Sequence, residues 1–371
     1  MQRISKRKPA SRRWSPCKVP GVSERHPEDT RPRPTRAARA TLRDVAQRAG
    51  VHPSLVSRVV NDDPKAYASD ETRQRIMSAV RELGYRPHFA ARGLRMSRSL
   101  TIGLLVPDLS NPMYPPIIRG IEAQAQNLGY GLIIGSHVEG STQATFNHLL
   151  EQSRVDALIV ASGLVDDAFV RGLAEIESAP VVSLNRRVRG VRASVTVDDE
   201  RGARLAVEHL AALGHRQIGG VFGSTKIDTA RRRDAGYEGA LRDLGLRPLK
   251  SDQDSWTMRA GYQGGLDLLR RRKPPTAIFA PSIAMGIGVL RAAQEEGIAV
   301  PGELSTIALH DSDIADYLAP PLTTVAMPAE DMGRQAAELA VELINGGKPR
   351  HILVPGEPTL VVRSTTASPT R

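Results

Sequence analysis

The sequence predicts a small all-α head that contains a helix-turn-helix, followed by a two-lobed α/β body. Within residues 41–86, short apolar stripes recur at helical spacing, which predicts three helices. From residue 100 onward, apolar runs bounded by Gly, Asp, Ser or Asn alternate with amphipathic stretches, which predicts repeated strand and helix units. The length of 371 residues is sufficient for a head and a substantial body.

The first predicted helix begins after Thr41, whose side chain can cap it, and Gly50 supplies the permissive backbone of a tight turn at its end. The second helix follows at once, with His52 or its neighbour as cap and Pro53 at the first helical position. The apolar residues expected to point inward are Leu42, Val45 and Ala49 in the first helix and Leu55, Val56 and Val59 in the second. The residues expected to stay outside on the second helix are Pro53, Ser54, Ser57 and Arg58.

A third helix is predicted over about 69–83, with Ile76, Val80 and Leu83 as its apolar stripe. Two short helices alone bury too little surface to be stable. The third helix would complete a three-helix core around them.

The body is predicted to form two lobes with a cleft between them. Continuous apolar runs suit strands that are buried on both faces of a parallel sheet, and ligands gather at the carboxyl ends of such strands. The pattern falls into halves at about 100–197 and 198–325, and the segment MPAEDMGRQAAELAVELINGG is expected to cross back to the first half. The predicted strands lie in TIGLLVPDL, YGLIIGS, VDALIVAS, APVVSLN, QIGGVFGS, TAIFAPS and LSTIALHD.

Charge is distributed unevenly along the chain. Residues 1–40 contain 12 Lys and Arg against 3 Asp and Glu, residues 41–99 contain 11 against 6, and the remainder contains 28 against 31. A basic front end on a mildly acidic body is typical of a nucleic-acid-binding protein. Residues 1–40, rich in Arg, Pro and Ser, are predicted to be a disordered basic tail.

The sequence also favours a cytoplasmic location. Cys17 is the only cysteine, so neither an internal disulfide nor a thiolate metal cluster is expected. No apolar run approaches the roughly 20 residues that span a bilayer, and the amino terminus lacks a secretory apolar stretch. No membrane association, metal or cofactor is therefore predicted.

The motifs TLRDVA, AGV, VSRVVN, ETR and ELGYRP resemble the signature of the LacI-type transcriptional regulators, the lactose and purine repressor family. The resemblance covers residues 41 to about 365. It implies a helix-turn-helix DNA-binding domain at 41–86, a hinge helix and linker at 87–99, and an effector-binding and dimerisation domain at 100–371. It further implies that the body has the periplasmic-binding-protein-like fold.

By this resemblance, base edges are met by Pro53, Ser54 and Arg58, and phosphates by Thr41, Ser57, Asn61 and Ser69. A guanidinium such as that of Arg58 can bond guanine O6 and N7 together. The alternative for Arg58 is a solvated surface charge. His52 and Pro53 differ from the polar residues often found there, so the operator sequence stays open.

The resemblance places Leu94 as a wedge in the minor groove and Arg92 and Arg95 near phosphates. An apolar wedge unstacks a base step and bends the duplex. Gly93 weakens the hinge helix before DNA binds. An ordinary core leucine is the alternative interpretation of Leu94.

The resemblance also implies an effector site in the cleft. Its expected residues are Asp108, Asn111, Tyr114, Asn185, Thr229, Arg233, Trp256, Ser282 and Asp311. The structural alternatives are that Asp311 caps a turn, that Arg233 pairs with Asp234 or a surface acid, and that Trp256 is core. Ser282 and Ile283 replace an Asn-Asp pair that is frequent in the family, which makes an ordinary monosaccharide less favoured and leaves nucleobases, sugar acids and other polar metabolites open.

The sequence therefore predicts a regulator, most readily a repressor, that binds a near-palindromic double-stranded operator as a homodimer and responds to a small polar effector. Whether the effector releases or promotes DNA binding stays open. A solute receptor is disfavoured by the head and by the lack of an export signal. An enzyme is disfavoured because no P-loop, nucleophile elbow or metal-ligand cluster is found, and His215 and His310 have structural alternatives. The chain lacks the tetramer-forming leucine heptad that part of the family has at its end, so the resemblance implies a dimer rather than a tetramer.

Overall fold

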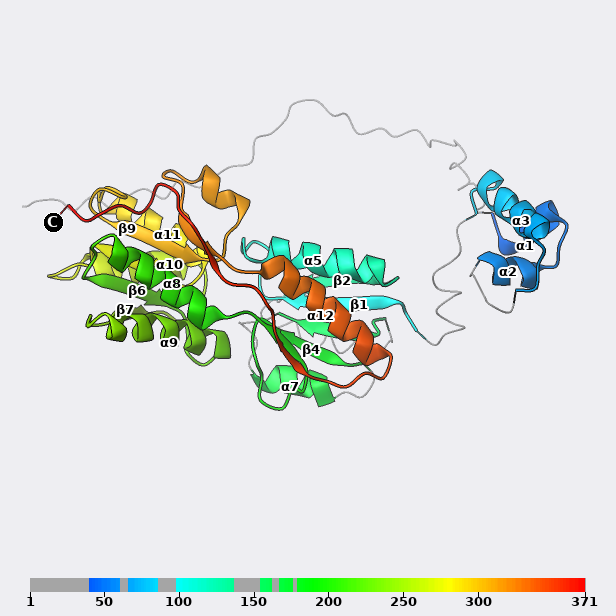
Figure 1. The fold of residues 1–371 in the computed structure, drawn as a ribbon, viewed down its shortest axis with the longest axis horizontal. Coiled ribbons are helices and arrows are strands. Elements are labelled where there is room, and N and C mark those ends of the chain that lie inside the picture. Colours follow the sequence, from blue (N-terminus) through cyan, green and yellow to red (C-terminus); the bar gives the residue numbers. More distant parts are fainter. Residues whose placement is uncertain are drawn as a thin grey trace, which may run out of the picture. The chain divides into compact units, whose positions relative to one another are not determined.

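The computed structural model describes residues 40–60, 66–85, 98–136, 154–161, 167–175 and 179–370. Its contacts divide the chain into two compact units, Met1–Pro87 and His88–Arg371, which are described separately below (Figure 1). Most of the predicted tail and hinge lies outside the described residues, as do Asn61, Arg92, Leu94 and Arg95.

The head consists of the three predicted helices. They are α1 (Leu42–Ala49), α2 (Pro53–Val60) and α3 (Asp70–Glu82). Thr41 caps α1 through a capping box: its hydroxyl accepts the Asp44 N–H at 3.4 Å, and the Asp44 carboxylate accepts the Thr41 N–H at 2.7 Å. Gly50 ends α1 in the left-handed conformation with φ +66°, as a tight turn requires.

The core of the head differs from the predicted pattern in α2 and α3. Val45, Val56 and Ile76 are fully buried, but Leu83 is 36% exposed and Ala79 is buried instead. Ser57 was predicted to face outward and is only 6% exposed. Because α2 packs against both α1 and α3, the buried part of its surface is wider than a single apolar stripe.

The first lobe of the body is built on a parallel six-stranded sheet in the order β11-β5-β4-β3-β1-β2. Its strands are β1 (Thr101–Val106), β2 (Gly131–Ser136), β3 (Ala157–Val160), β4 (Val181–Leu184), β5 (Ser194–Thr196) and β11 (His351–Leu353). Its described helices are α5 (Tyr114–Asn127), α7 (Asp167–Glu175) and α12 (Ala329–Ile344).

The second lobe repeats this plan with the order β12-β10-β9-β8-β6-β7, in which only β12 is antiparallel to its neighbour. Its strands are β6 (Ile218–Phe222), β7 (Leu249–Asp252), β8 (Ala277–Ala280), β9 (Ser305–Leu309), β10 (Thr323–Ala326) and β12 (Thr359–Val361). Its helices are α8 (Asp199–Ala212), α9 (Asp228–Asp243), α10 (Met258–Leu269), α11 (Ile283–Glu295) and the short 3-10 helix η1 (Asp313–Tyr317).

Successive side chains of a strand point to opposite faces of its sheet, and each face of each sheet has its own apolar core. In β8, Phe279 packs in the core shared with α8 and α9, whereas Ile278 and Ala280 pack in the core shared with α10 and α11. In β1, Leu104 and Leu105 divide in the same way between the core of α5 with α12 and the core of α7. The lobes therefore have helices on both faces, as predicted for buried parallel strands.

All seven predicted strand segments contain strands of the structure, β1 to β4, β6, β8 and β9. The prediction that β2 is buried on both faces is wrong, because β2 is an edge strand with half-exposed and exposed residues. The predicted return to the first lobe is confirmed, since α12 packs against α5. The chain then crosses a further time, from β11 in the first sheet to β12 in the second, which the sequence pattern did not indicate.

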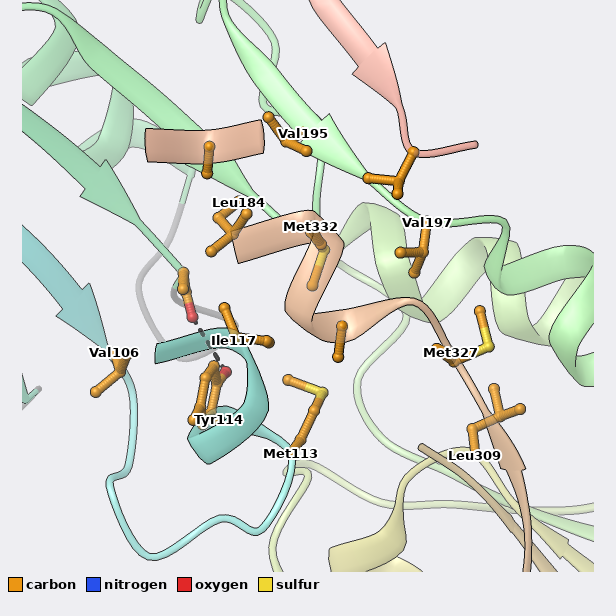
Figure 2. Close-up of a cluster of buried hydrophobic side chains, with 14 of the residues drawn as sticks. Val106, Met113, Tyr114, Ile117, Leu184, Val195, Val197, Leu309, Met327 and Met332 are labelled. Atoms are coloured by element: carbon orange, nitrogen blue, oxygen red, sulfur yellow. Dashed lines mark hydrogen bonds between the residues drawn. The ribbon is translucent and has the colours of Figure 1, made fainter. Parts of the chain in front are cut away.

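A continuous apolar cluster accompanies the crossing segments. It extends from Ile117 and Met332 in the first lobe to Leu309 and Met327 where α12 is entered from the second (Figure 2). Val197, on the other crossing segment, belongs to the same cluster. The two lobes are thus joined by packed side chains as well as by backbone.

Candidate functional site

The outward face of α2 carries two of the predicted base-reading side chains. Ser54 and Arg58 are exposed and lie four residues apart, so they share one face of the helix. The Ser54 hydroxyl lies 2.8 Å from His52 Nδ1, which also accepts the Ser54 N–H at 3.2 Å and so supports the start of α2. Pro53 is half-buried at the first helical position. This face can present a guanidinium to a groove.

The predicted phosphate-contacting residues occupy two different kinds of position. Thr41 and Ser69 are caps: Ser69 Oγ accepts the Thr72 N–H at 3.3 Å at the start of α3. Two hydrogen bonds from Thr41, the backbone N–H and then the hydroxyl, lower the pKa of Asp44. Ser57, by contrast, is buried among the helices, which does not fit a side chain that reaches a phosphate in this conformation.

A cavity of about 280 Å³ lies between the lobes of the body, at the carboxyl ends of several strands. Eight of the nine predicted effector residues line it. They are Asp108, Asn111, Tyr114 and Asn185 from the first lobe, and Thr229, Arg233, Trp256 and Ser282 from the second. The residues predicted from the sequence therefore do surround a cavity. That these eight residues contact an effector stays a prediction.

Several of these polar side chains already form hydrogen bonds within the first lobe. The Asp108 carboxylate accepts the Ser110 N–H at 2.8 Å, and Asn111 Oδ1 accepts the Met113 N–H at 3.1 Å. The Tyr114 hydroxyl donates to the Ala161 carbonyl at 3.1 Å, and burial raises the pKa of this phenol (Figure 2). These bonds shape the cavity wall.

Arg233 is the most constrained group of the site and is only 2% exposed. Its Nε donates to Asp199 Oδ1 at 2.7 Å, and its Nη1 to the Pro281 carbonyl at 2.7 Å. Its Nη2 donates to His310 Nε2 at 2.7 Å. The alternative pairing with Asp234 or a surface acid is wrong, because Arg233 pairs with the buried Asp199 and the Asp234 carboxylate accepts from Lys250.

The ring of Trp256 forms a wall beside this arginine, with the Arg233 guanidinium carbon 5.4 Å from the ring centre. Gly223 makes room for the ring, because a Cβ atom at this position would come within 2.5 Å of it. Trp256 is half-buried and belongs to the edge of the second-lobe core as well as to the cavity.

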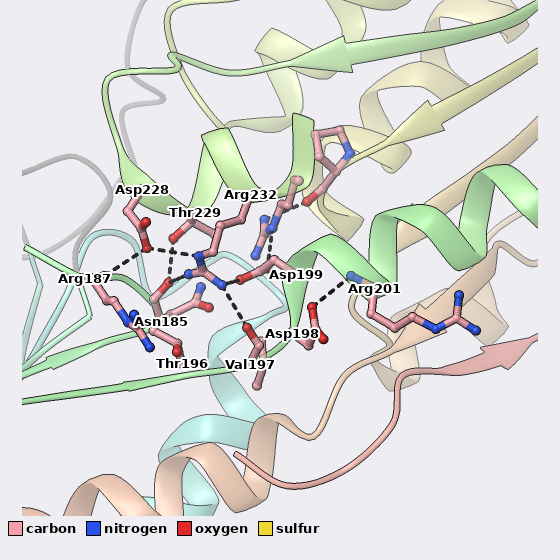
Figure 3. Close-up of polar contacts among 12 residues, drawn as sticks. Asn185, Arg187, Thr196, Val197, Asp198, Asp199, Arg201, Asp228, Thr229 and Arg232 are labelled. Carbon is pink, nitrogen blue, oxygen red and sulfur yellow. Dashed lines mark hydrogen bonds and ion pairs between the residues drawn. The ribbon is translucent and has the colours of Figure 1, made fainter. Parts of the chain in front are cut away.

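The two lobes are hydrogen-bonded to one another beside the cavity (Figure 3). The Asn185 carbonyl, which follows β4, accepts the Thr229 hydroxyl at 2.5 Å and Arg232 Nη2 at 3.1 Å, both from α9. Arg232 also bonds Asp199 and Asp228, and the Asp228 carboxylate accepts the Arg187 N–H at 3.0 Å. Asn185 has φ +60°, a conformation that asparagine tolerates better than most residues.

Asp311 departs from the prediction, because it is not among the residues that line the cavity. Its carboxylate accepts Arg363 Nη1 at 2.8 Å and the Thr324 hydroxyl at 2.6 Å. The preceding residue, His310, is the one beside Arg233, at the end of β9 where the backbone takes φ +67°. A shift of one residue at the end of a strand reverses the direction of the side chain.

Sequence reasoning missed several lining residues, among them Arg186, Ile227, Met258 and Arg259. Arg186 follows Asn185 directly and lies 3.4 Å from the Asp167 carboxylate. Met258 and Arg259 begin α10, which follows β7, a strand that the sequence did not indicate. A signal was present for Arg186, since it stands directly after a predicted buried strand.

Comparison with known proteins gives two family matches. Residues 41–88 match the model of bacterial regulatory proteins, lacI family, and residues 207–366 match that of a periplasmic binding protein-like domain. The HTH-type transcriptional regulator DegA of Bacillus subtilis is 32% identical, over 89% of this chain and 98% of its own length. The chain belongs to the LacI family of bacterial regulatory proteins.

Other LacI-family relatives support the same conclusion. The HTH-type transcriptional repressor CytR of Escherichia coli is 34% identical over 83% of this chain and 90% of its own length. The lac repressor dimer bound to operator and the anti-inducer ONPF is 29% identical, with a TM-score of 0.73 and coverage of 88% and 99% of the two chains. The CelR–cellobiose complex is 30% identical, with a TM-score of 0.67 and coverage of 88% and 100%.

These relatives are transcriptional regulators, and the helix-turn-helix head and periplasmic-binding-protein-like body place this chain among them in fold and in general function. None of the helices in the described ranges combines the length and apolarity that crossing a bilayer requires.

Proposed function

We propose that this LacI-family chain is a repressor that binds a near-palindromic operator as a homodimer and whose operator affinity is set by a small metabolite in the interlobe cavity. In a homodimer each head binds one half-site, so the operator has the same two-fold symmetry as the protein. The protein acts on DNA, which is the basis for proposing a cytoplasmic location. We assign it no enzymatic role, because the relatives reported above, DegA and CytR, are transcriptional regulators.

The observation that carries this proposal is the combination, in one chain, of an exposed face on α2 with a cavity between the two lobes of the body. On α2, Ser54 and Arg58 face solvent together, while the cavity holds a deeply buried arginine and a tryptophan wall. A ligand changes DNA affinity only through its different affinities for two states of the body. The hydrogen bonds from Thr229 and Arg232 to Asn185 join the lobes and are the contacts that opening would break.

Arg58→Ala is expected to weaken binding to the selected operator by about 1–3 kcal/mol and to relax the preference at one base pair of each half-site. The physical reason is the loss of two parallel hydrogen bonds to one base. The measurement is a selection from random duplexes, followed by affinities of wild type and variant at one fixed salt concentration.

Arg75→Ala on α3 is the matched control, since it removes an equal charge from another exposed site of the head. It is expected to leave the preferred sequence unchanged. If Arg58→Ala selects the same sequence with the same stringency as the wild type, Arg58 does not read a base.

A further inference from the structure

We infer that the cavity binds an organic carboxylate with a largely apolar body, an inference that rests on the proposed effector function of this cavity. Three features of the described wall lead to it: three arginines against one carboxylate, a Ser282 hydroxyl that is engaged as a helix cap, and broad apolar surfaces.

The charged side chains of the wall are mostly cationic. Among the residues that the structure describes, Arg186, Arg233 and Arg259 line the cavity, and Asp108 is the one carboxylate in its wall. The two Oδ atoms of Asp108 share the single proton of the Ser110 hydroxyl, at 2.7 and 2.9 Å, so this carboxylate can still accept hydrogen bonds. A ligand therefore encounters more positive than negative charge in the described wall, where Asn185 Oδ1 is a buried acceptor without a partner.

The acids that balance two of these arginines lie behind the wall. Asp199 is fully buried and pairs with Arg233 and with Arg232, and Arg232 also pairs with Asp228, so two carboxylates outside the lining serve these two guanidinium groups. Asp167, beside Arg186, is also outside the lining. Arg233 directs three of its five N–H groups at protein acceptors and retains two further donors, which suits a bidentate anion.

His310 adds no negative charge next to Arg233. Because an arginine can only donate, His310 Nε2 is the unprotonated nitrogen, and the neutral ring carries its proton on Nδ1. Burial, and secondly the Arg233 charge, hold the pKa of His310 well below its ordinary value. An aspartate at this position would give Arg233 a second carboxylate beside Asp199, whereas the neutral histidine adds no negative charge.

A ligand rich in hydroxyl groups would find few hydrogen-bond partners in the second-lobe part of the wall. Ser282 Oγ accepts the Met285 N–H at 3.3 Å as the cap of α11, and Ile283 is a buried apolar residue. Much of the remaining wall is carbon, from Met113, Ile227 and Met258. Hydroxyls buried against such a surface without partners are destabilising. The apolar part of a ligand can pack against this apolar surface, next to the Trp256 ring.

The experiment measures thermal stability and affinity of the full chain, at constant ionic strength, with pairs of probes that match in shape and differ in charge. The pairs are benzoate with benzamide and cyclohexanecarboxylate with its amide, and the neutral hydroxylated probes are glucose, ribose and cytidine. Carboxylates are expected to stabilise the chain by mass action and to bind at least about tenfold more tightly than their amides.

Arg259→Gln is expected to weaken carboxylate binding roughly two- to fivefold, the range of a partly exposed charge pair, and to leave amide binding unchanged. Arg291→Gln, on the exposed surface of α11, removes the same charge outside the cavity and is expected to change neither. Equal binding of amides and carboxylates, greatest stabilisation by a neutral hydroxylated probe, or no stabilisation by any carboxylate would each overturn the inference.

Operator affinity measured on the same samples separates this inference from the proposed function. A neutral sugar that binds the cavity and alters operator affinity would leave the regulatory function intact and refute the carboxylate. Absence of sequence-specific DNA binding would refute the function, whichever probes bind.

Discussion

Gly120→Ala is expected to destabilise the body by about 3 kcal/mol, at the upper end of the range for overpacking a core. Gly120 lies on α5 where this helix crosses α12, and a Cβ atom there would be 2.0 Å from the Glu330 carbonyl oxygen. Across the same crossing, a Cβ at Gly333 would be 2.2 Å from the Ile117 carbonyl oxygen. The obstacles are backbone atoms, so no change of side-chain rotamer relieves the clash and the helices must separate.

The matched control is Gly172→Ala on α7 in the same lobe, where a Cβ atom meets nothing within 4 Å. This variant is expected to be neutral or to gain roughly 0.5–1 kcal/mol, because alanine favours the helix more than glycine does. Urea denaturation followed by circular dichroism measures both. Similar unfolding free energies for the two variants would contradict the close crossing of α5 and α12. This crossing holds α12 on the first lobe directly after the chain leaves the second lobe at β10.

Arg233→Ala is expected to lower the unfolding free energy by about 3 kcal/mol, because it removes one partner of a buried ion pair. The variant leaves the Pro281 carbonyl and His310 Nε2 without their donors and opens space against Trp256. Asp199 keeps Arg232, which places the loss at the lower end of the range for a broken buried pair. The variant is also expected to lose the stability gained from any ligand of the cavity.

Arg259→Ala serves as the control for folding, since its exposed side chain is expected to change unfolding free energy by no more than about 0.5 kcal/mol. The comparison uses equilibrium denaturation without ligand. A loss below about 1 kcal/mol for Arg233→Ala would mean that the network around Asp199 is not a stabilising unit of the body.

Much of the fold could be predicted because buried strands have unambiguous sequences. Runs such as TIGLLV and TAIFA are long, apolar and bounded by turn residues, and they became β1 and β8. β7, with the sequence LKSD, is a partly exposed edge strand and lacks that signal. The three-residue strands β5, β11 and β12 are too short to give a periodic signal, and β11 and β12 pair with strands that are distant in sequence.

The site could be located but not resolved from sequence. Residues at strand ends such as Asp108 and Asn185 were found because parallel strands deliver their carboxyl ends to one edge. The sequence could not predict that His310, rather than Asp311, lies beside Arg233, since this depends on the left-handed backbone conformation of His310. Burial of Ser57 likewise follows from how α2 packs between its neighbours.

The most direct test of the regulatory account is the ratio of affinities for a selected palindromic duplex and a scrambled duplex of equal length, measured with the full chain at about 0.15 M salt. Salt must be fixed because phosphate contacts make all affinities depend on it. The account predicts a ratio of roughly 10³ or more with two chains bound per palindrome. Equal affinity for the two duplexes, with the chain folded and with or without the carboxylate probes, would contradict it.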